Sequence, residues 1–458
     1  MKKIFISLAI AIFAGQSFGQ NAEELFGKKL SDYNRNPKTD LIRCATDEYN
    51  QELVAKHRVE TKEQFENWLA PKVAQMEKSI AQNSAKKVVV TIPVVVHVIH
   101  SGQPISNNGR NITDSRILSQ ITVLNQDFRR MLNTPGYNSN PIGADIEIEF
   151  CLAKTNPSGG ATTGIDRVNL GNTYIWDETN VESILKPSTI WDPTKYFNIW
   201  VCEFGGDLDG VLGYAQFPQS SGLAGLQGPY TANTDGVVIH WAAFGSSDYV
   251  GGSYFPDIDK GRTATHEIGH FFGLRHIWGD NSSCTVNATD SFNDYCLDTP
   301  AQSTLHYDCA AIYDTCPSNP GNDMTENYMD YSNDTCMNTF TQNQKTRILT
   351  VLQNSPRRAS LTTSTVCGTP LAVSESALSK DEINIYPNPV KDYLNIYSKK
   401  GIKITRYSIF NAVGQEVLKK EVKSEADLKI GKENLGTGFF MITVYTENSY
   451  KTFKFIVE

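Results

Sequence analysis

An eleven-residue string at positions 266–276, His-Glu-Ile-Gly-His-Phe-Phe-Gly-Leu-Arg-His, constrains this chain more than any other segment. On an α-helix, His266 and His270 leave the same face because they are four residues apart, so both imidazoles can bind one metal ion. Gly273 can adopt a positive φ that is costly for other residues, which lets the helix end and the chain turn back. His276 then becomes a third ligand.

This ligand set predicts the kind of metal site. Three histidines leave one position of a tetrahedral zinc ion open for water, which is typical of a catalytic site and not of a closed structural one. Glu267, beside the first ligand, can accept a proton from that water. A bare His-Glu-x-x-His pair also occurs on surface helices, but the longer string in a chain with 8 histidines argues against that interpretation. We therefore expect a zinc peptidase.

A second string, Asn327-Tyr-Met-Asp-Tyr331, follows further along the chain. Together with the histidine string it resembles the metzincin metallopeptidases, in which a methionine turn lies beneath the metal. The resemblance implies that Met329 forms the floor of the site without binding zinc. It also implies that Tyr331 hydrogen-bonds the oxyanion in the transition state, whereas either residue alone would be interpreted as packing.

Within the metzincins, the chain resembles the pappalysin (ulilysin-like, M43) family over roughly residues 88–352. The strings that carry the resemblance are Ile92-Pro-Val-Val-Val-His-Val-Ile99, Gly213-Tyr-Ala-Gln-Phe-Pro218, Gly261-Arg-Thr-Ala-Thr-His266, Asp298-Thr-Pro300 and the run from Asn327 through Cys336 to Phe340. Membership implies a metallopeptidase domain, expected over residues 59–367, that hydrolyses protein and peptide substrates. Its active-site cleft would lie between an upper, sheet-bearing subdomain and a smaller, loop-rich lower one.

The periodicity of the chain agrees with an α+β fold that contains a mixed sheet, a zinc helix and a Met turn. Residues 88–100 form a nearly continuous β-branched run, as expected of a strand buried on both faces. Residues 112–130 have the apolar spacing of a helix, and so do residues 61–82. Further strands are predicted at residues 146–152, 197–204 and 236–241.

The amino-terminal residues predict export. Lys2 and Lys3 precede an apolar run over residues 4–13, and small residues at Ser17 and Gly19 fit a cleavage site, so residues 1–19 are expected to be a signal peptide. No later stretch approaches twenty apolar residues, and no transmembrane segment is expected. The net charge of −8, without a basic stripe, argues against nucleic acid as a partner.

Residues 20–58 are expected to be a propeptide that contains Cys44. A thiolate is a good zinc ligand, so this cysteine can occupy the open coordination position and keep the precursor latent. Pappalysin-like proenzymes carry a similar Arg-Cys element. The alternative is an ordinary disulfide partner, for example of Cys367. Activation would require a cut between Cys44 and the catalytic core, for which Lys56-His-Arg58 is a basic candidate.

Nine cysteines in an exported chain predict disulfides plus one cysteine left over. Sequence alone does not fix the connectivity. The resemblance to pappalysins implies the pairs Cys284–Cys316 and Cys309–Cys336. The remaining cysteines stay unassigned; beside Cys44 they are Cys151, Cys202, Cys296 and Cys367.

An oxygen-rich cluster follows the histidine string. Its members are Asp290, Asp294, Asp298 and Thr299. Carboxylate and hydroxyl oxygens suit calcium, and pappalysin-like enzymes carry structural calcium near a similar Asp-Thr-Pro element. A solvated acidic loop is the alternative, because Asn293 replaces a glycine of the family pattern and Cys296 interrupts the segment.

The carboxy-terminal part has a different pattern. Residues 368–382 are rich in Ser, Ala and Lys and are expected to be a linker, and residues 383–458 alternate strands with Asn/Gly turns, as in a small all-β sandwich. This segment resembles the sorting domain of type IX secretion cargo, which implies export by the type IX machinery and later removal. The alternative is a module for carbohydrate or surface adhesion.

Two competing functions are a catalytically silent zinc-containing surface adhesin and a structural zinc site. Glu267 argues against the first because a binding protein does not need it, and the open three-histidine set argues against the second. Substrate preference stays open. Asn333 and Asp334 lie near the expected S1′ pocket, and the resemblance implies that an acidic group in this pocket would favour arginine. The segments after Gly213 and around Val237 are candidates for an edge strand that pairs with an extended peptide.

Overall fold

The computed structural model describes residues 24–82, 89–220, 232–285, 294–368, 383–399, 402–411, 416–446 and 450–458. The expected signal peptide at 1–19 and residues 369–382 of the expected linker lie outside these ranges. The chain divides into two compact units: the first comprises Met1–Ala153 with Thr163–Cys367, and the second comprises Lys154–Thr162 with Gly368–Glu458.

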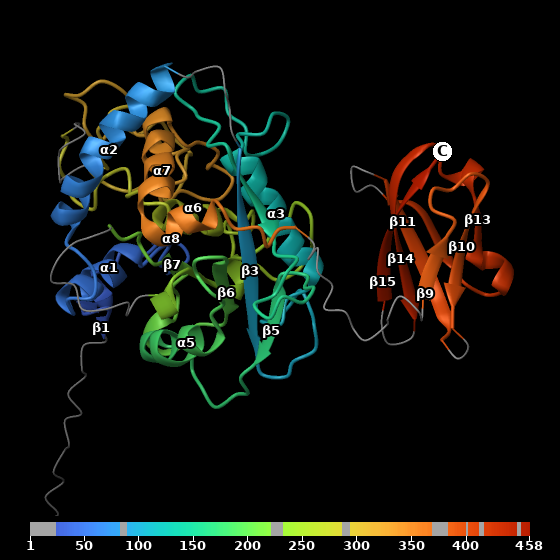
Figure 1. Ribbon diagram of the computed structural model, residues 1–458. Coiled ribbons are helices and arrows are strands. Elements are labelled where there is room, and N and C mark those ends of the chain that lie inside the picture. The colour runs from blue at the N-terminus through green and yellow to red at the C-terminus, as the bar shows by residue number, and fades with distance from the viewer. Residues whose placement is uncertain are drawn as a thin grey trace, which may run out of the picture. The chain divides into compact units, whose positions relative to one another are not determined.

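A mixed six-stranded sheet forms the centre of the first unit (Figure 1). Its strands are β3 (Val90–His100), β4 (Ile148–Leu152), β5 (Ile165–Asn169), β6 (Phe197–Cys202), β7 (Gly213–Ala215) and β8 (Val237–His240). The order is β4-β3-β6-β8-β7, and β5 pairs with the second half of β3. All neighbouring strands are parallel except β7, which runs antiparallel to β8 and forms an edge of the sheet. The predicted α+β fold with a mixed sheet is confirmed.

Helices and short helical turns surround this sheet. The helices are α1 (Thr46–Ala55), α2 (Lys62–Gln82), α3 (Asp114–Phe128), α4 (Glu178–Asn180), α5 (Lys186–Thr189), α6 (Arg262–Phe271), α7 (Gln342–Asn354) and α8 (Pro356–Leu361); η2 (Val181–Leu185) joins α4 to α5. The side chain of Thr113 caps α3 by accepting a hydrogen bond from the backbone of Arg116, and Thr341 forms a capping box at the start of α7. Figure 1 shows α2 and α7 packed side by side.

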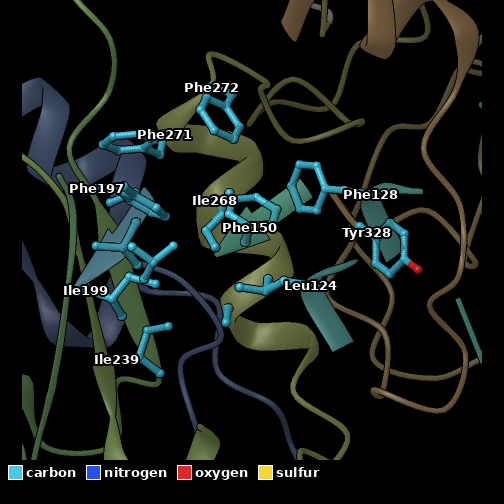
Figure 2. Packing of buried hydrophobic residues seen from close by; sticks show 14 of the residues in the cluster. Leu124, Phe128, Phe150, Phe197, Ile199, Ile239, Ile268, Phe271, Phe272 and Tyr328 are labelled. Carbon is cyan, nitrogen blue, oxygen red and sulfur yellow. The ribbon is translucent and has the colours of Figure 1, made fainter. Parts of the chain in front are cut away.

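One face of the sheet packs against α3 and α6. Figure 2 shows the core between them; the labelled side chains are Leu124, Phe128, Phe150, Phe197, Ile199, Ile239, Ile268, Phe271, Phe272 and Tyr328. Because alternate residues of a strand point to opposite faces, Val94 and Val96 of β3 belong to this core. This packing fixes the histidine-bearing helix α6 directly against the sheet.

The opposite face of the sheet is covered partly by the expected propeptide. A second apolar cluster combines Ile99, Trp200, Val211, Tyr214 and Val238 with residues from upstream of position 60. These upstream residues are Leu25, Phe26, Tyr33, Ile42, Ala45, Tyr49, Leu53 and Val59. They come from the hairpin β1 (Glu24–Leu25) and β2 (Lys28–Lys29), from α1, from the loops between them and, for Val59, from the loop after α1. The segment 24–59 is therefore an integral part of the first unit.

The second unit is an all-β sandwich. One sheet contains β9 (Ile383–Tyr386), β10 (Tyr393–Ser398) and β13 (Lys429–Gly431), and the other contains β11 (Ile404–Asn411), β12 (Glu416–Glu421), β14 (Gly438–Thr446) and β15 (Tyr450–Val457). Apolar side chains from both sheets form its core. The predicted small sandwich is confirmed.

No helix in the described part of the chain combines the length and the apolar character that crossing a bilayer requires.

Candidate metal centre and active site

Helix α6 and the turn after it bring the three predicted histidines together. The Nε2 atoms of His266 and His270 are 3.1 Å apart, and the Nε2 atom of His276 lies 3.3 Å and 3.0 Å from them. Gly273 has φ +90°, and an added Cβ there would lie 2.9 Å from a side-chain carbon of Val351. Both the backbone conformation and the close packing therefore require glycine at the point where the chain turns back.

The second ring nitrogen of each histidine has an acceptor that fixes the ring. Nδ1 of His266 donates to the carbonyl of Tyr328 at 2.7 Å, and Nδ1 of His270 donates to the carbonyl of Leu274 at 2.8 Å. In the third ligand, Nδ1 of His276 donates to Oδ1 of Asp280 at 2.5 Å. With Nδ1 protonated, each Nε2 lone pair is directed at the shared centre.

Burial keeps these imidazoles neutral. It lowers the pKa of His266 and of His270 well below the usual range for histidine, and it lowers the pKa of His276 to about 3. Neutral imidazole is the form that binds a metal. Three converged neutral nitrogen donors, each supported by an acceptor behind it, fit a zinc ion.

Cys44 completes this group of donors. Its thiol and the three histidine nitrogens all lie within 4.8 Å of one another, and all four residues are buried. Histidine nitrogen and cysteine sulfur are both usual zinc ligands, and four such donors match the tetrahedral coordination of zinc. The structure thus places the predicted switch cysteine with the histidines, and Cys367, its alternative disulfide partner, is instead bonded to Cys151.

Glu267 lies beside the metal-binding group and is fully buried. Its Oε2 accepts a hydrogen bond from the Thr46 hydroxyl at 2.7 Å and lies 3.4 Å from the sulfur of Cys44. Its Oε1 has no hydrogen-bond partner among the described residues. Burial raises the pKa of this carboxyl group to about 8. In this state the carboxyl group that is expected to act as base is occupied by the upstream segment.

Gly213 allows β7 to approach Glu267. A Cβ at this glycine would lie 3.0 Å from the carbonyl of Val238 and 3.3 Å from Cγ of Glu267. The carbonyl of Gly213 accepts a hydrogen bond from the backbone of Ala45. The predicted edge strand is therefore β7, while Val237 lies in β8, one strand further in.

The two residues of the expected Met turn, Met329 and Tyr331, lie close to α6 and to its histidines. A Cβ added at Gly269 would be 2.4 Å from the sulfur of Met329, so this methionine packs directly against α6. The ring of Tyr331 lies 5.0 Å from the ring of His276 and 5.7 Å from that of His266. Its hydroxyl donates to the backbone carbonyl of Cys44 at 3.3 Å.

A buried ion pair adjoins the metal centre. Nη2 of Arg43 lies 2.9 Å from Oδ1 of Asp334, and both side chains are almost fully buried. The other carboxylate oxygen of Asp334 accepts hydrogen bonds from the backbone of Lys260 and of Arg262, at the start of α6. Nε and Nη1 of Arg43 have no partner among the described residues.

Three disulfides are present. They are Cys284–Cys316 and Cys309–Cys336, the two pairs that the resemblance implied, and Cys151–Cys367. The expectation of a single leftover cysteine was wrong, because Cys44, Cys202 and Cys296 are all free and buried. The three lie in different environments: Cys44 in the metal-binding group, Cys202 in β6 and Cys296 in the loop next to Asp294.

The oxygen-rich cluster is only partly described, since Asp290 lies outside the described residues. Asp294 accepts hydrogen bonds from the hydroxyl of Thr299 at 3.0 Å, and burial raises the pKa of Asp294 to about 7. Asp298 instead accepts from the Thr341 hydroxyl and from the backbone of Asn343, at the start of α7. Calcium binding remains a prediction.

Three further contributors to the site were not singled out as site residues from the sequence: Thr46, Asp280 and the pairing of Arg43 with Asp334. Asp280 follows His276 by four positions, and Thr46 follows Cys44 by two, so proximity to the predicted ligands was the available signal. The pairing of Arg43 with Asp334 had no local signal, because 291 positions separate the two residues.

The fold and the site define a metallopeptidase, and its similarity to known proteins shows the family to which it belongs. Residues 178–353 match the peptidase family M43 model, described as pregnancy-associated plasma protein-A, and residues 384–458 match the secretion system C-terminal sorting domain. An extracellular metalloprotease of Colletotrichum graminicola is 32% identical over 282 residues, which cover 61% of this chain and 83% of that protein. Another, of Verticillium alfalfae, is 28% identical over 76% of this chain and 96% of that protein.

Among solved structures, mature mirolysin of Tannerella forsythia in complex with a cleaved peptide is 37% identical, with a TM-score of 0.50 over 63% of this chain and 98% of that one. Mirolysin in complex with a small compound is 36% identical, with a TM-score of 0.51 over 62% and 99% of the two chains. The chain belongs to the pappalysin (M43) family of metallopeptidases. Its sorting domain and its extracellular relatives show that it is an exported protein.

Proposed function

We propose that this protein is a secreted zinc-dependent endopeptidase that is synthesised as a latent precursor. The observation that carries the proposal is the convergence of three neutral histidine nitrogens beside the carboxyl group of Glu267. Zinc at this position would polarise the scissile carbonyl and lower the pKa of a water molecule toward 7.

The chain's own residues would perform the remaining steps. Glu267 accepts the proton of the attacking water and returns it to the leaving amine. Tyr331 donates to the oxyanion, a role supported by the hydrogen bond that its hydroxyl already makes to the carbonyl of Cys44. The edge strand β7 pairs with the backbone of an extended substrate, as it now does with Ala45.

In the precursor, the segment around Cys44 would block this chemistry. Cys44 supplies a fourth donor where water is needed, and Thr46 occupies the carboxyl group of Glu267. Activation would then require a cut after this segment. Lys56, His57 and Arg58 fit such a cut because they are exposed in the loop between α1 and α2.

The Arg43–Asp334 pair supports a substrate preference. Asp334 lies in the segment after the Met turn, which is expected to form the S1′ pocket, and a guanidinium group from the propeptide already occupies it. We expect the processed enzyme to accept arginine directly after the scissile bond, because a buried carboxylate with a free oxygen position binds a guanidinium group well.

The sorting domain would direct the precursor to the type IX secretion machinery and then be removed, which fits its match over residues 384–458.

Calcium bound at Asp294 and Thr299 would be structural. The buried contact between these two side chains supports this second metal site. Calorimetric titration of calcium into the metal-free and the zinc-loaded protein tests whether calcium binds.

The experiment that tests the function is cleavage of a quenched-peptide library by the secreted, processed protein, with product termini determined by mass spectrometry. Glu267→Ala and a zinc chelator serve as controls, and both should abolish turnover. Internal cuts establish an endopeptidase. If zinc-loaded protein that demonstrably lacks Cys44 cleaves nothing, the proposal is wrong and the silent adhesin becomes the better explanation.

A further inference from the structure

The side chain of Tyr49, in the propeptide helix α1, occupies a pocket formed by the catalytic domain. Only 1% of Tyr49 is exposed. Its ring lies 5.1 Å from the ring of Tyr214 in β7 and 5.1 Å from that of Phe26, and each pair meets at a steep angle. Such tilted contacts are favourable for aromatic rings.

The same pocket recognises the phenol hydroxyl. The hydroxyl of Tyr49 donates to Oε2 of Glu182 at 2.6 Å, and the hydroxyl of Tyr214 donates to Oε1 at 2.7 Å. The ammonium group of Lys186 pairs with Oε1 at 2.5 Å. It also lies 5.0 Å from the ring centroid of Tyr49, within the range of a cation–π interaction. Ring and hydroxyl of Tyr49 therefore have separate partners, both charged.

These partners remain when the propeptide leaves. Tyr214, Glu182 and Lys186, which we call the tyrosine pocket, lie downstream of the proposed cut, whereas Tyr49 and Phe26 lie upstream of it. After the cut, Oε2 of Glu182 loses the hydroxyl that now donates to it, and the apolar wall of the pocket is uncovered. Both changes favour a new occupant that brings a donor and an aromatic ring.

The tyrosine pocket has a cleft beside it. A cleft of about 390 Å³ adjoins it and is lined by Leu53 and Lys56 on the propeptide side and by Glu182, Ser183 and Pro187 on the other. The cleft is therefore continuous with the tyrosine pocket at Glu182, and removal of α1 would widen it.

Its position relative to the metal centre follows from the path of the propeptide. Arg43 contacts Asp334, Cys44 lies at the histidines, and Thr46 hydrogen-bonds to Ala215 of β7 before α1 continues to Tyr49. Along the chain, Arg43, which contacts Asp334, thus precedes Cys44, the residue at the metal centre, and Tyr49 follows it. If Asp334 binds the residue after the scissile bond, the tyrosine pocket lies on the side that binds the residues before it.

We propose that, in the processed enzyme, the tyrosine pocket binds a tyrosine side chain of the substrate on the amino-terminal side of the scissile bond. This inference rests on the proposed function, because it assumes that the processed protein cleaves peptides and has lost α1. It adds a second specificity site to the one at Asp334.

The test begins with the full-length chain, activated by cleavage in the loop at Lys56–Arg58. Quenched peptides with arginine after the scissile bond carry tyrosine, phenylalanine or alanine at each of several positions before it. At one of these positions we expect tyrosine to raise kcat/KM about tenfold over phenylalanine, which corresponds to one hydrogen bond to a charged group. Glu182→Gln should remove the difference between tyrosine and phenylalanine. The matched control Glu149→Gln should keep it, because Glu149 lies in β4, at the opposite edge of the sheet from β7, and does not line the cleft.

Binding provides a readout that does not depend on turnover. A fluorescent peptide with the sequence of residues 46–56 should bind the activated protein about tenfold more tightly than the same peptide with phenylalanine in place of Tyr49. Equal kcat/KM values for tyrosine and phenylalanine at every position, together with equal peptide affinities, would overturn the inference and leave the peptidase function intact. Absence of cleavage of all peptides would refute the peptidase function, and the peptide affinities would then decide about the pocket alone.

Discussion

The hydroxyl of Thr46 lies 2.7 Å from Oε2 of Glu267, while Cys44, two positions earlier, lies with the three histidines. The proposed propeptide therefore contacts both components of the proposed catalytic apparatus, the metal-binding group and the base, through two different side chains. A thiol at the metal would exclude the water, and a hydroxyl at Glu267 would occupy the group that accepts its proton.

Because Cys44 contacts the histidines and Thr46 contacts Glu267, we predict that neither residue alone accounts for the latency of the precursor. We expect unprocessed Cys44→Ala to cleave a quenched peptide faster than the wild-type precursor, and Cys44→Ala combined with Thr46→Val to be about tenfold faster again, for one hydrogen bond lost. Initial rates, measured before any processed band appears on a gel, provide the test. Cys202→Ala, which removes another buried free cysteine, is the matched control. Equal rates for the single and double variants would show that Thr46 does not contribute to latency.

Asp280 is predicted to strengthen metal binding through His276. It is the only carboxylate among the three acceptors behind the ligands in the described structure, since the other two are the carbonyls of Tyr328 and Leu274. We expect Asp280→Asn to lower zinc affinity about 10- to 100-fold, the usual effect of losing such a partner. Competition with a chromophoric chelator measures it, and Asp314→Asn on an exposed loop is the control. Unchanged zinc affinity would mean that the carboxylate of Asp280 does not contribute to metal binding through His276.

Much of the metal centre could be predicted because the three histidines lie close together in the sequence. The spacing of His266 and His270 and the glycine before His276 specify a helix and a turn within eleven residues, so the sequence predicts their convergence without knowledge of the fold. The buried strand β3 was likewise predictable from its β-branched run. The short strand β7 was suggested only by resemblance, because three residues are too few for a periodicity.

Contacts between distant segments were not predictable. Nothing near Arg43 indicates that its partner is Asp334, and nothing near Tyr49 indicates Glu182, because the tertiary fold alone brings these residues together. The same reason explains the cysteines. An even pairing assumes that leftover thiols can meet, but Cys202 is buried in the second apolar cluster and Cys296 is buried beside Asp294.

Asp334 is predicted to determine selectivity for arginine. In the processed enzyme, Asp334→Asn removes the charge but keeps an oxygen that can accept from the backbone of Lys260 and Arg262. We therefore expect kcat/KM for a peptide with arginine after the scissile bond to fall about 30-fold, for ~2 kcal/mol of charge-assisted hydrogen bonding, and that for leucine to change little. Asp257→Asn is the control, because only the backbone of Asp257 contacts Asp334. An equal loss for arginine and leucine peptides would mean that Asp334 acts only by positioning α6.

A buried ion-pair network at Glu66 predicts how stability depends on pH. Glu66 of α2 receives Nη1 and Nη2 of Arg347 at 2.7 and 2.6 Å and Nε of Arg275 at 2.9 Å. Burial alone would raise the pKa of Glu66, but the two guanidinium groups outweigh it and lower that pKa below the usual range. Because the folded pKa is lower than the unfolded value of about 4.3, this stabilisation is present above pH ~4.3 and is lost as pH falls through the folded pKa.

We expect Glu66→Gln to lower the free energy of unfolding by about 3–5 kcal/mol at pH 7, because the substitution leaves two buried cations unpaired. We also expect the free energy of unfolding of this variant to fall less steeply than that of the wild type as the pH is lowered. Glu63→Gln, on the exposed face of the same helix, should do neither. Urea unfolding from pH 7 down to pH 3 measures both effects, and parallel acid limbs for wild type and Glu66→Gln would show that this network does not set the acid sensitivity.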